Sequence, residues 1–75
     1  MVDLGKIANE MERVDGVSSA YVELSSDVIR VEGAGWMIND RSALEGLQQH
    51  IIDECRLDVS GSEVHERDCE LLFRF

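Results

Sequence analysis

Residues 19–32 read Ser-Ala-Tyr-Val-Glu-Leu-Ser-Ser-Asp-Val-Ile-Arg-Val-Glu, and this stretch decides the fold class. Apolar and polar residues alternate in residues 19–24 and again in residues 28–32, which is typical of strands with one solvated face. Between them, Ser25, Ser26 and Asp27 have the composition of a turn. Because this connection is short, we expect an antiparallel hairpin.

A helical pattern lies on each side of this hairpin. Apolar residues at helical spacing predict one helix over about residues 3–15, with Asp3 as its N-cap and Gly16 after its end. A second such stripe predicts a helix over residues 41–56, where Ser42 and Glu45 have the spacing of a capping box. The chain therefore mixes helices and strands.

A second hairpin follows, with strands expected at residues 57–65 and 69–75 around a polar turn at residues 66–68. We predict one α+β domain over residues 1–75, a two-layer sandwich of order αββαββ whose four-stranded antiparallel sheet carries both helices on one face. We expect the strand that ends at Phe75 to leave a sheet edge open. The expected core is Leu4, Ile7, Met11, Val14, Ala20, Val22, Leu24, Ile29, Val31, Leu44, Leu47, Ile51, Cys55, Val64, Leu71 and Phe73.

The charge balance limits the function. The 75 residues hold 16 acidic and seven basic side chains, for a formal net charge of −9, and Lys6 is the single lysine. This charge opposes binding to nucleic acid through phosphate contacts. No apolar run reaches the roughly 18 residues of a membrane span, and we see no signal peptide, so we expect a soluble cytoplasmic protein with no membrane partner. The composition is similar to that of proteins from salt-accumulating halophiles, and also to that of acidic proteins from GC-rich genomes.

Four potential metal ligands are present: His50, Cys55, His65 and Cys69. His50 and Cys55 are five residues apart, so they diverge by about 140° around a helix. His65 and Cys69 flank the second hairpin turn and could approach each other. Structural zinc sites usually pair their ligands two to four residues apart on tight turns, and His50 and Cys55 do not have this arrangement. Both cysteines follow the apolar phase of their segments, which predicts buried thiols. We expect no metal, no cofactor and no catalytic residue.

Two resemblances to known families can be traced. The stretch from Ile7 to Glu32, with Val14-Asp15-Gly16-Val17 between helix and hairpin, resembles the helix–hairpin part of heavy-metal-associated domains. The metal-binding Cys-x-x-Cys of that family is absent here, so the resemblance implies no metal role. The element order also resembles BON domains and the ring-building modules of secretion systems, which implies an interaction module.

We expect a non-enzymatic interaction or assembly module that forms a homodimer through the sheet face that the helices leave bare. The candidate interface residues are Tyr21, Val28, Arg30, Trp36, Leu72 and Arg74. Tryptophan, tyrosine and arginine are enriched in interface hot spots. A rival expectation is that Trp36 folds back over the Gly33–Gly35 bend and covers the core of its own subunit.

Two other functions stay open. One is a small enzyme or ligand-binding domain that uses His50 or His65 with a cysteine. The other is an acidic mimic of nucleic acid that inhibits a nucleic-acid-binding protein. Another protein is also a conceivable partner.

Overall fold

A computed structural model describes residues 3–75 and shows two α-helices and a four-stranded antiparallel sheet. The predicted α+β class is confirmed. The predicted domain also includes Met1 and Val2, which lie outside the described residues. In chain order the elements are α1 (Leu4–Met11), β1 (Val17–Glu23), β2 (Val28–Gly33), the 3-10 helix η1 (Gly35–Met37), α2 (Arg41–Cys55), β3 (Gly61–His65), the 3-10 helix η2 (Glu66–Asp68) and β4 (Glu70–Arg74).

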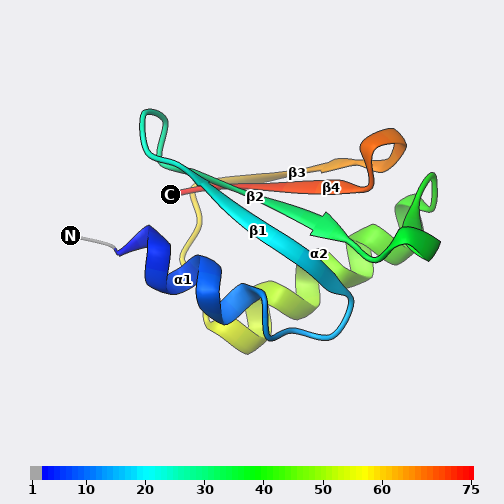
Figure 1. Cartoon of the computed structure of the whole chain (residues 1–75), viewed down its shortest axis with the longest axis horizontal. Helices are drawn as coiled ribbons and strands as arrows, with labels where there is room; N and C mark the ends of the chain where they lie inside the picture. The colour runs from blue at the N-terminus through cyan, green and yellow to red at the C-terminus, as the bar shows by residue number, and fades with distance from the viewer. Residues whose placement is uncertain (1–2) are drawn as a thin grey trace.

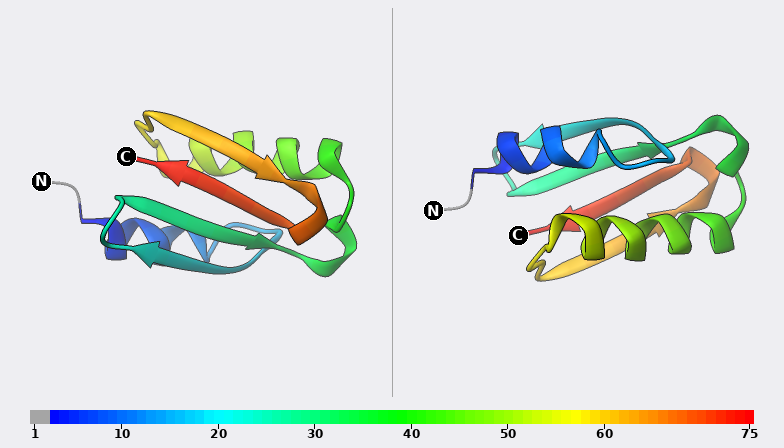
Figure 2. Two further views of the ribbon diagram at one scale, coloured as in Figure 1. Left: turned by 90° about the horizontal axis from the view of Figure 1, so that it is seen from above. Right: turned by 90° about the horizontal axis from the view of Figure 1, so that it is seen from below.

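The sheet has the strand order β1-β2-β4-β3, with every neighbouring pair antiparallel. Figure 1 shows the strands above the helices, and Figure 2 shows β1 and β3 on the two borders of the sheet. The prediction that the strand ending at Phe75 forms an edge is wrong, because β4 pairs with β2 on one side and β3 on the other. Burial explains this placement: three consecutive residues of β4, Leu71 to Phe73, are buried, whereas every residue of β3 is half-buried.

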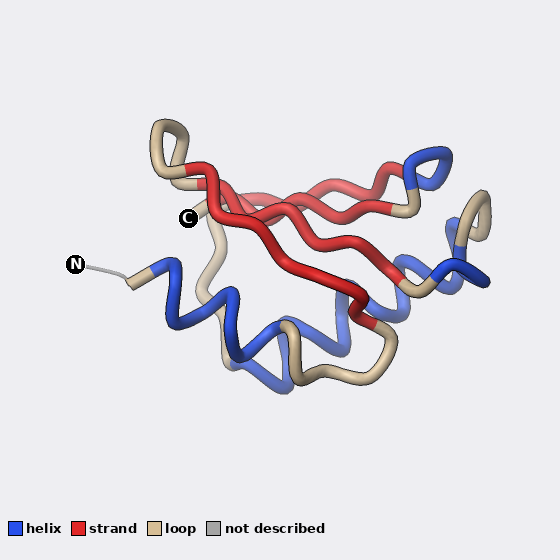
Figure 3. Tube along the Cα trace, viewed as in Figure 1, coloured by secondary structure: helices blue, strands red, loops and turns tan. Residues whose placement is uncertain are grey.

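The main core lies between the sheet and the helices. Both helices run beneath the same face of the sheet in Figure 3. The side chains with no exposed surface there are Met11, Ile29, Val31, Leu44, Ile51, Leu71 and Phe73. These residues come from both helices and both central strands, so one apolar cluster holds the two layers together. We call this covered side the inner face of the sheet.

The first helix is shorter than predicted. It ends at Met11 rather than near residue 15, and a turn follows in which the amide of Val14 donates to the carbonyl of Met11. Gly16 then adopts a φ of 97°, and a Cβ at this position would lie 2.9 Å from Cε of Met37. Glycine is therefore required here both for the backbone conformation and for the close approach of Met37.

Two expectations about the core are wrong. Leu24 was expected inside, yet it is exposed, because β1 ends at Glu23 and Leu24 belongs to the turn. Met37 was not expected inside, yet only 5% of its surface is exposed and it packs in the main core. The turn geometry of η1 determines this placement, and hydropathy periodicity does not detect it.

The second helix agrees with the prediction in extent, but its cap does not. Its N-cap is Asp40, whose carboxylate accepts a hydrogen bond from the amide of Ala43 at 3.0 Å. The predicted capping box from Ser42 and Glu45 is therefore wrong. Asp40 lies one residue before the helix, which is where a side-chain oxygen reaches the unpaired amides of the first turn.

Candidate interaction surface

The face of the sheet turned away from the helices, here called the outer face, has a regular pattern of side chains. Residues of β1 and β2 that pair across the ladder point to the same face, and Tyr21 pairs with Arg30, which pairs with Leu72. Since Ile29, Val31, Leu71 and Phe73 point inward, their strand neighbours point outward. The outer face consists of Ser19, Tyr21, Glu23, Val28, Arg30, Glu32, Gly61, Glu63, His65, Glu70, Leu72 and Arg74.

Two apolar residues of the outer face, one on each central strand, are buried. Val28 is 7% exposed and Leu72 is 6% exposed, and neither belongs to the apolar cluster between sheet and helices. Among the described elements, both helices lie on the opposite side of the sheet (Figure 1). Their cover therefore comes from the sheet and its turns, and charged side chains are their neighbours in the ladder.

The charged side chains of the outer face form ion pairs. Arg30 binds both Glu23 and Glu70, the latter with an Nη1–Oε1 distance of 2.7 Å. Glu63 binds Arg74 and also His65, with 3.0 Å between Oε1 and Nε2. The ion pairs Arg30–Glu70 and Arg74–Glu63 run diagonally on the two sides of Leu72 in the ladder.

These contacts perturb the acids. The hydrogen bond from Arg30 lowers the pKa of Glu23 below its ordinary value. The hydrogen bonds from His65 and Arg74 lower the pKa of Glu63 in the same way. The lowered pKa values follow from the ion pairs and favour the ionised form of both carboxylates.

The predicted interface residues do not all lie together. Tyr21, Arg30 and Arg74 lie on the outer face, and Tyr21 is 52% exposed. Val28 and Leu72 lie there too, but buried. Trp36 lies in η1, outside the paired strands and between β2 and α2.

Trp36 is 71% exposed, so the rival expectation that it covers the core of its own subunit is wrong. Its neighbour Met37 has that role. The outer face therefore does not carry the expected exposed patch of Tyr21, Val28, Trp36 and Leu72. It presents one exposed aromatic ring, with charged side chains beside two buried apolar residues.

The outer face is much less acidic than the rest of the molecule. It holds four glutamates and two arginines, a formal net charge of −2, while the whole chain carries −9. The remaining −7 therefore lies on the helices, the turns and the ends of the strands. Three of the four glutamates on the outer face, Glu23, Glu63 and Glu70, are bound to a basic side chain.

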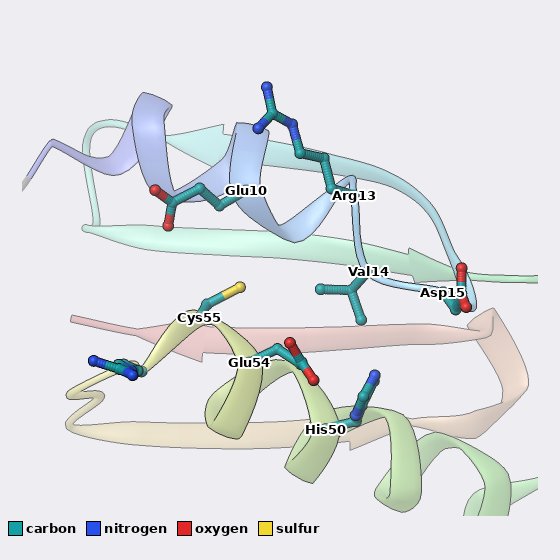
Figure 4. A pocket seen from close by; sticks show the side chains of 8 residues that line it. Glu10, Arg13, Val14, Asp15, His50, Glu54 and Cys55 are labelled. Carbon is teal, nitrogen blue, oxygen red and sulfur yellow. The ribbon is translucent and has the colours of Figure 1, made fainter.

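A groove of about 680 Å³ lies between the end of α1 and the second half of α2. It contains His50 and Cys55, two of the potential ligands singled out from the sequence, together with Glu10, Arg13, Val14, Asp15, Glu54 and Arg56. Figure 4 shows the Cys55 thiol pointing between the helices and Glu54 lying between it and His50. Both groups therefore reach the groove, although Glu54 separates them.

The surroundings of both thiols disfavour the thiolate form. Burial, followed by the negative charges of Glu10 and Glu54, raises the pKa of Cys55. Burial also raises the pKa of Cys69, whose Sγ donates to the carbonyl of Ala34 at 3.3 Å. A raised pKa lowers the thiolate fraction at neutral pH, and the thiolate is the nucleophile and the metal ligand.

The four potential metal ligands are distributed over three places: His50 and Cys55 in the groove, His65 on the outer face and Cys69 in the core. Within residues 3–75, no group of three or more histidine, cysteine or acidic side chains is placed to hold a metal ion. In the same residues, no helix has both the length and the apolar character needed to cross a bilayer.

No family model, no curated protein and no solved structure matches this chain.

Proposed function

We propose that this protein is a non-enzymatic interaction or assembly module that self-associates through the outer face of its sheet. In this proposal the molecule is a two-layer sandwich with both helices on one face and the contact surface on the other. One observation carries it: Val28 and Leu72 are buried on the two central strands, on the face that lies opposite the helices. A sheet face that only meets water is mostly polar, so apolar residues beside charged side chains favour a contact role.

Charge supports the choice of a second copy as the partner. Two molecules of net charge −9 repel each other, and the repulsion is weakest where the local charge is lowest. The outer face combines both signs with a net charge of −2. Arginine and tyrosine, both present there, are residues that interfaces prefer.

The other two functions have less support. Raised thiol pKa values oppose a cysteine nucleophile paired with His50 or His65. The acidic mimic of nucleic acid is supported by the net charge of −9 alone, and on the outer face three of the four glutamates are bound to basic side chains.

Charge reversal at Arg74 tests the proposal. Arg74 is exposed on the outer face, so Arg74→Glu places a repulsive charge in the contact and should reduce the mass seen by light scattering. The matched control is Arg13→Glu, which makes the same change in net charge at an exposed position beside the groove between the helices (Figure 4), on the other side of the molecule from the outer face. Each mass is measured at about 0.1 mM, well above a micromolar dissociation constant, with thermal unfolding recorded for both variants.

The wild-type protein and Arg13→Glu should show a mass above that of one chain, and Arg74→Glu should show the mass of a single chain. A wild-type monomer at this concentration, or an equal loss of mass in both variants, would contradict the proposal. Leu72→Arg is unsuitable as a test, because Leu72 is buried within the subunit and its replacement would also destabilise the fold.

A further inference from the structure

The free edge of β1 presents unpaired backbone groups at known positions. The backbone N–H of Gly33 donates to the carbonyl of Cys69, and the backbone N–H of Phe75 donates to the carbonyl of Asp27. The odd-numbered residues of β2 therefore form their backbone hydrogen bonds with β4. The even-numbered residues of β2 therefore bond to β1, where their partners are Ser19, Tyr21 and Glu23. It follows that Ala20 and Val22 direct their N–H and C=O groups away from the sheet.

This edge has few of the features that keep strand edges from pairing. Natural sheets protect their edges with lysine, proline, bulges or short strands. β1 is seven residues long and contains neither lysine nor proline, and its register shift lies between Val17 and Ser19, before the stretch Ala20–Glu23. Its one charged residue, Glu23, is bound to Arg30. The other edge, β3, is shorter and carries Glu63 and His65.

Ser19 adds a second, independent observation. Its hydroxyl oxygen is buried and has no hydrogen-bond partner. Among the side chains that the structure describes, no other buried oxygen or nitrogen lacks one. A buried hydroxyl without a partner destabilises a protein. A contact that supplies an acceptor at this position would remove the penalty.

We propose that two copies of this chain pair antiparallel through β1, with Tyr21 opposite Tyr21 of the second copy. In this register Ala20 and Val22 exchange backbone hydrogen bonds with Val22 and Ala20 of the second copy, and the two sheets become one of eight strands. Ser19 then lies opposite Glu23 of the second copy, and rotation of the Ser19 side chain about χ1 turns its buried hydroxyl toward that carboxylate. If the pairing were centred on Ala20, Glu23 would lie opposite Val17 of the second copy. If it were centred on Val22, Ser19 would lie opposite Ser25. Either register loses the Ser19–Glu23 pair.

This inference goes beyond the proposed function, because the edge of β1 and the outer face are different surfaces. Pairing at the edge leaves both outer faces on the same side of the joined sheet. The two contacts together would build a tetramer with two-fold symmetry at each interface. Each contact can fail without the other.

Amide hydrogen exchange tests the edge contact on the unmodified protein. The amides of Ala20 and Val22 should become protected as the protein concentration rises from about 1 µM to about 1 mM, a range that spans a modest dissociation constant. The Tyr21 amide, which bonds to β2, should be protected throughout. By the same alternation in β3, the amides of Ser62 and Val64 face its free edge and should exchange quickly at every concentration. If Ala20 and Val22 exchange as fast as Ser62 and Val64 at the highest concentration, the proposal is wrong.

Two variants separate the edge contact from the outer face. Ala20→Pro removes an outward N–H and should abolish the pairing, while Ala20→Ser keeps that N–H and should not. Arg74→Glu should leave the concentration-dependent protection of Ala20 and Val22 intact.

Ser19→Ala serves as a further test should the proline variant fail to fold. It should raise the dissociation constant for pairing at least about tenfold, because each dimer loses two charge-assisted hydrogen bonds. It should not lower the stability of the separate subunit, where the hydroxyl has no partner. An unchanged dissociation constant would overturn the assigned register.

Discussion

At the scale of single residues, the neighbours Trp36 and Met37 have opposite environments. Both lie in η1, yet Trp36 is mostly exposed and Met37 is buried against Gly16 and Gly33. A tight 3-10 turn directs successive side chains about 120° apart, so one enters the core and the next does not. Hydropathy favours the tryptophan for the buried position, and the turn gives that position to the methionine.

Truncating these two neighbours should therefore have unequal effects. Met37→Ala should lower the free energy of unfolding by about 2–5 kcal/mol, the usual cost of removing a buried methionine side chain. Trp36→Ala, the matched change at an exposed position, should stay within about 0.5 kcal/mol. Urea unfolding of both variants measures the difference, and a larger loss for Trp36→Ala would show that the tryptophan covers the core.

The raised thiol pKa values give a prediction about reactivity. Because a raised pKa leaves less thiolate at a given pH, native Cys55 and Cys69 should react with iodoacetamide more slowly than an unfolded control at pH 8. Cys69, which is buried in the core, should react more slowly than Cys55. Both rates should increase as the pH is raised above 9, and mass spectrometry of each alkylated peptide follows them. Fast labelling of native Cys55 at pH 7 would indicate an activated thiolate instead.

At the scale of elements, the start of α2 depends on Asp40. Asp40→Ala removes the acceptor for the amide of Ala43 and should destabilise the protein by about 1 kcal/mol. Ser42→Ala tests the capping box that the sequence suggests, and should have a smaller effect. Thermal unfolding of the two single variants decides between them, since a larger loss at Ser42 would place the cap there.

The sequence predicts where the helices and strands lie along the chain better than it predicts which strands pair in the sheet. Periodicity alone locates both helices and all four strands, because a stripe or an alternation reflects which face is buried. It also places Ile29, Val31, Leu71 and Phe73 inside correctly. Periodicity does not determine the strand order. That order depends on which strand buries more apolar surface when it lies in the middle of the sheet.

The candidate surface is predicted only in part for a related reason. The alternation in the strands assigns Tyr21, Val28, Arg30, Leu72 and Arg74 to the outer face, and the structure agrees. It cannot show that Arg30 and Arg74 bind glutamates of other strands beside Val28 and Leu72, because those pairs form between residues up to 40 positions apart in the sequence. The placement of Trp36 fails because no strand periodicity extends through η1.

At the scale of the whole molecule, the charge predicts a response to salt. Sixteen acidic side chains against seven basic ones destabilise the compact state by mutual repulsion, and salt screens that repulsion. The melting temperature should therefore rise with KCl up to molar concentrations if the composition reflects a salt-adapted protein. The same titration at about pH 4.5, where many carboxylates are protonated, should show a smaller rise. A constant melting temperature above about 0.2 M KCl would contradict the salt-adapted interpretation.

The position of β4 at the centre of the sheet has a consequence for how the protein is made. A ribosome synthesises α1, the first hairpin, α2 and β3 before it reaches residues 70–74, yet β3 contacts the rest of the sheet only through β4. Until those residues emerge, the apolar faces of both helices have only half a sheet to cover, and the place of Phe73 is empty. The nascent chain therefore stays incompletely folded until the last strand is synthesised, and a stop codon ahead of β4 would leave two halves with no ladder between them.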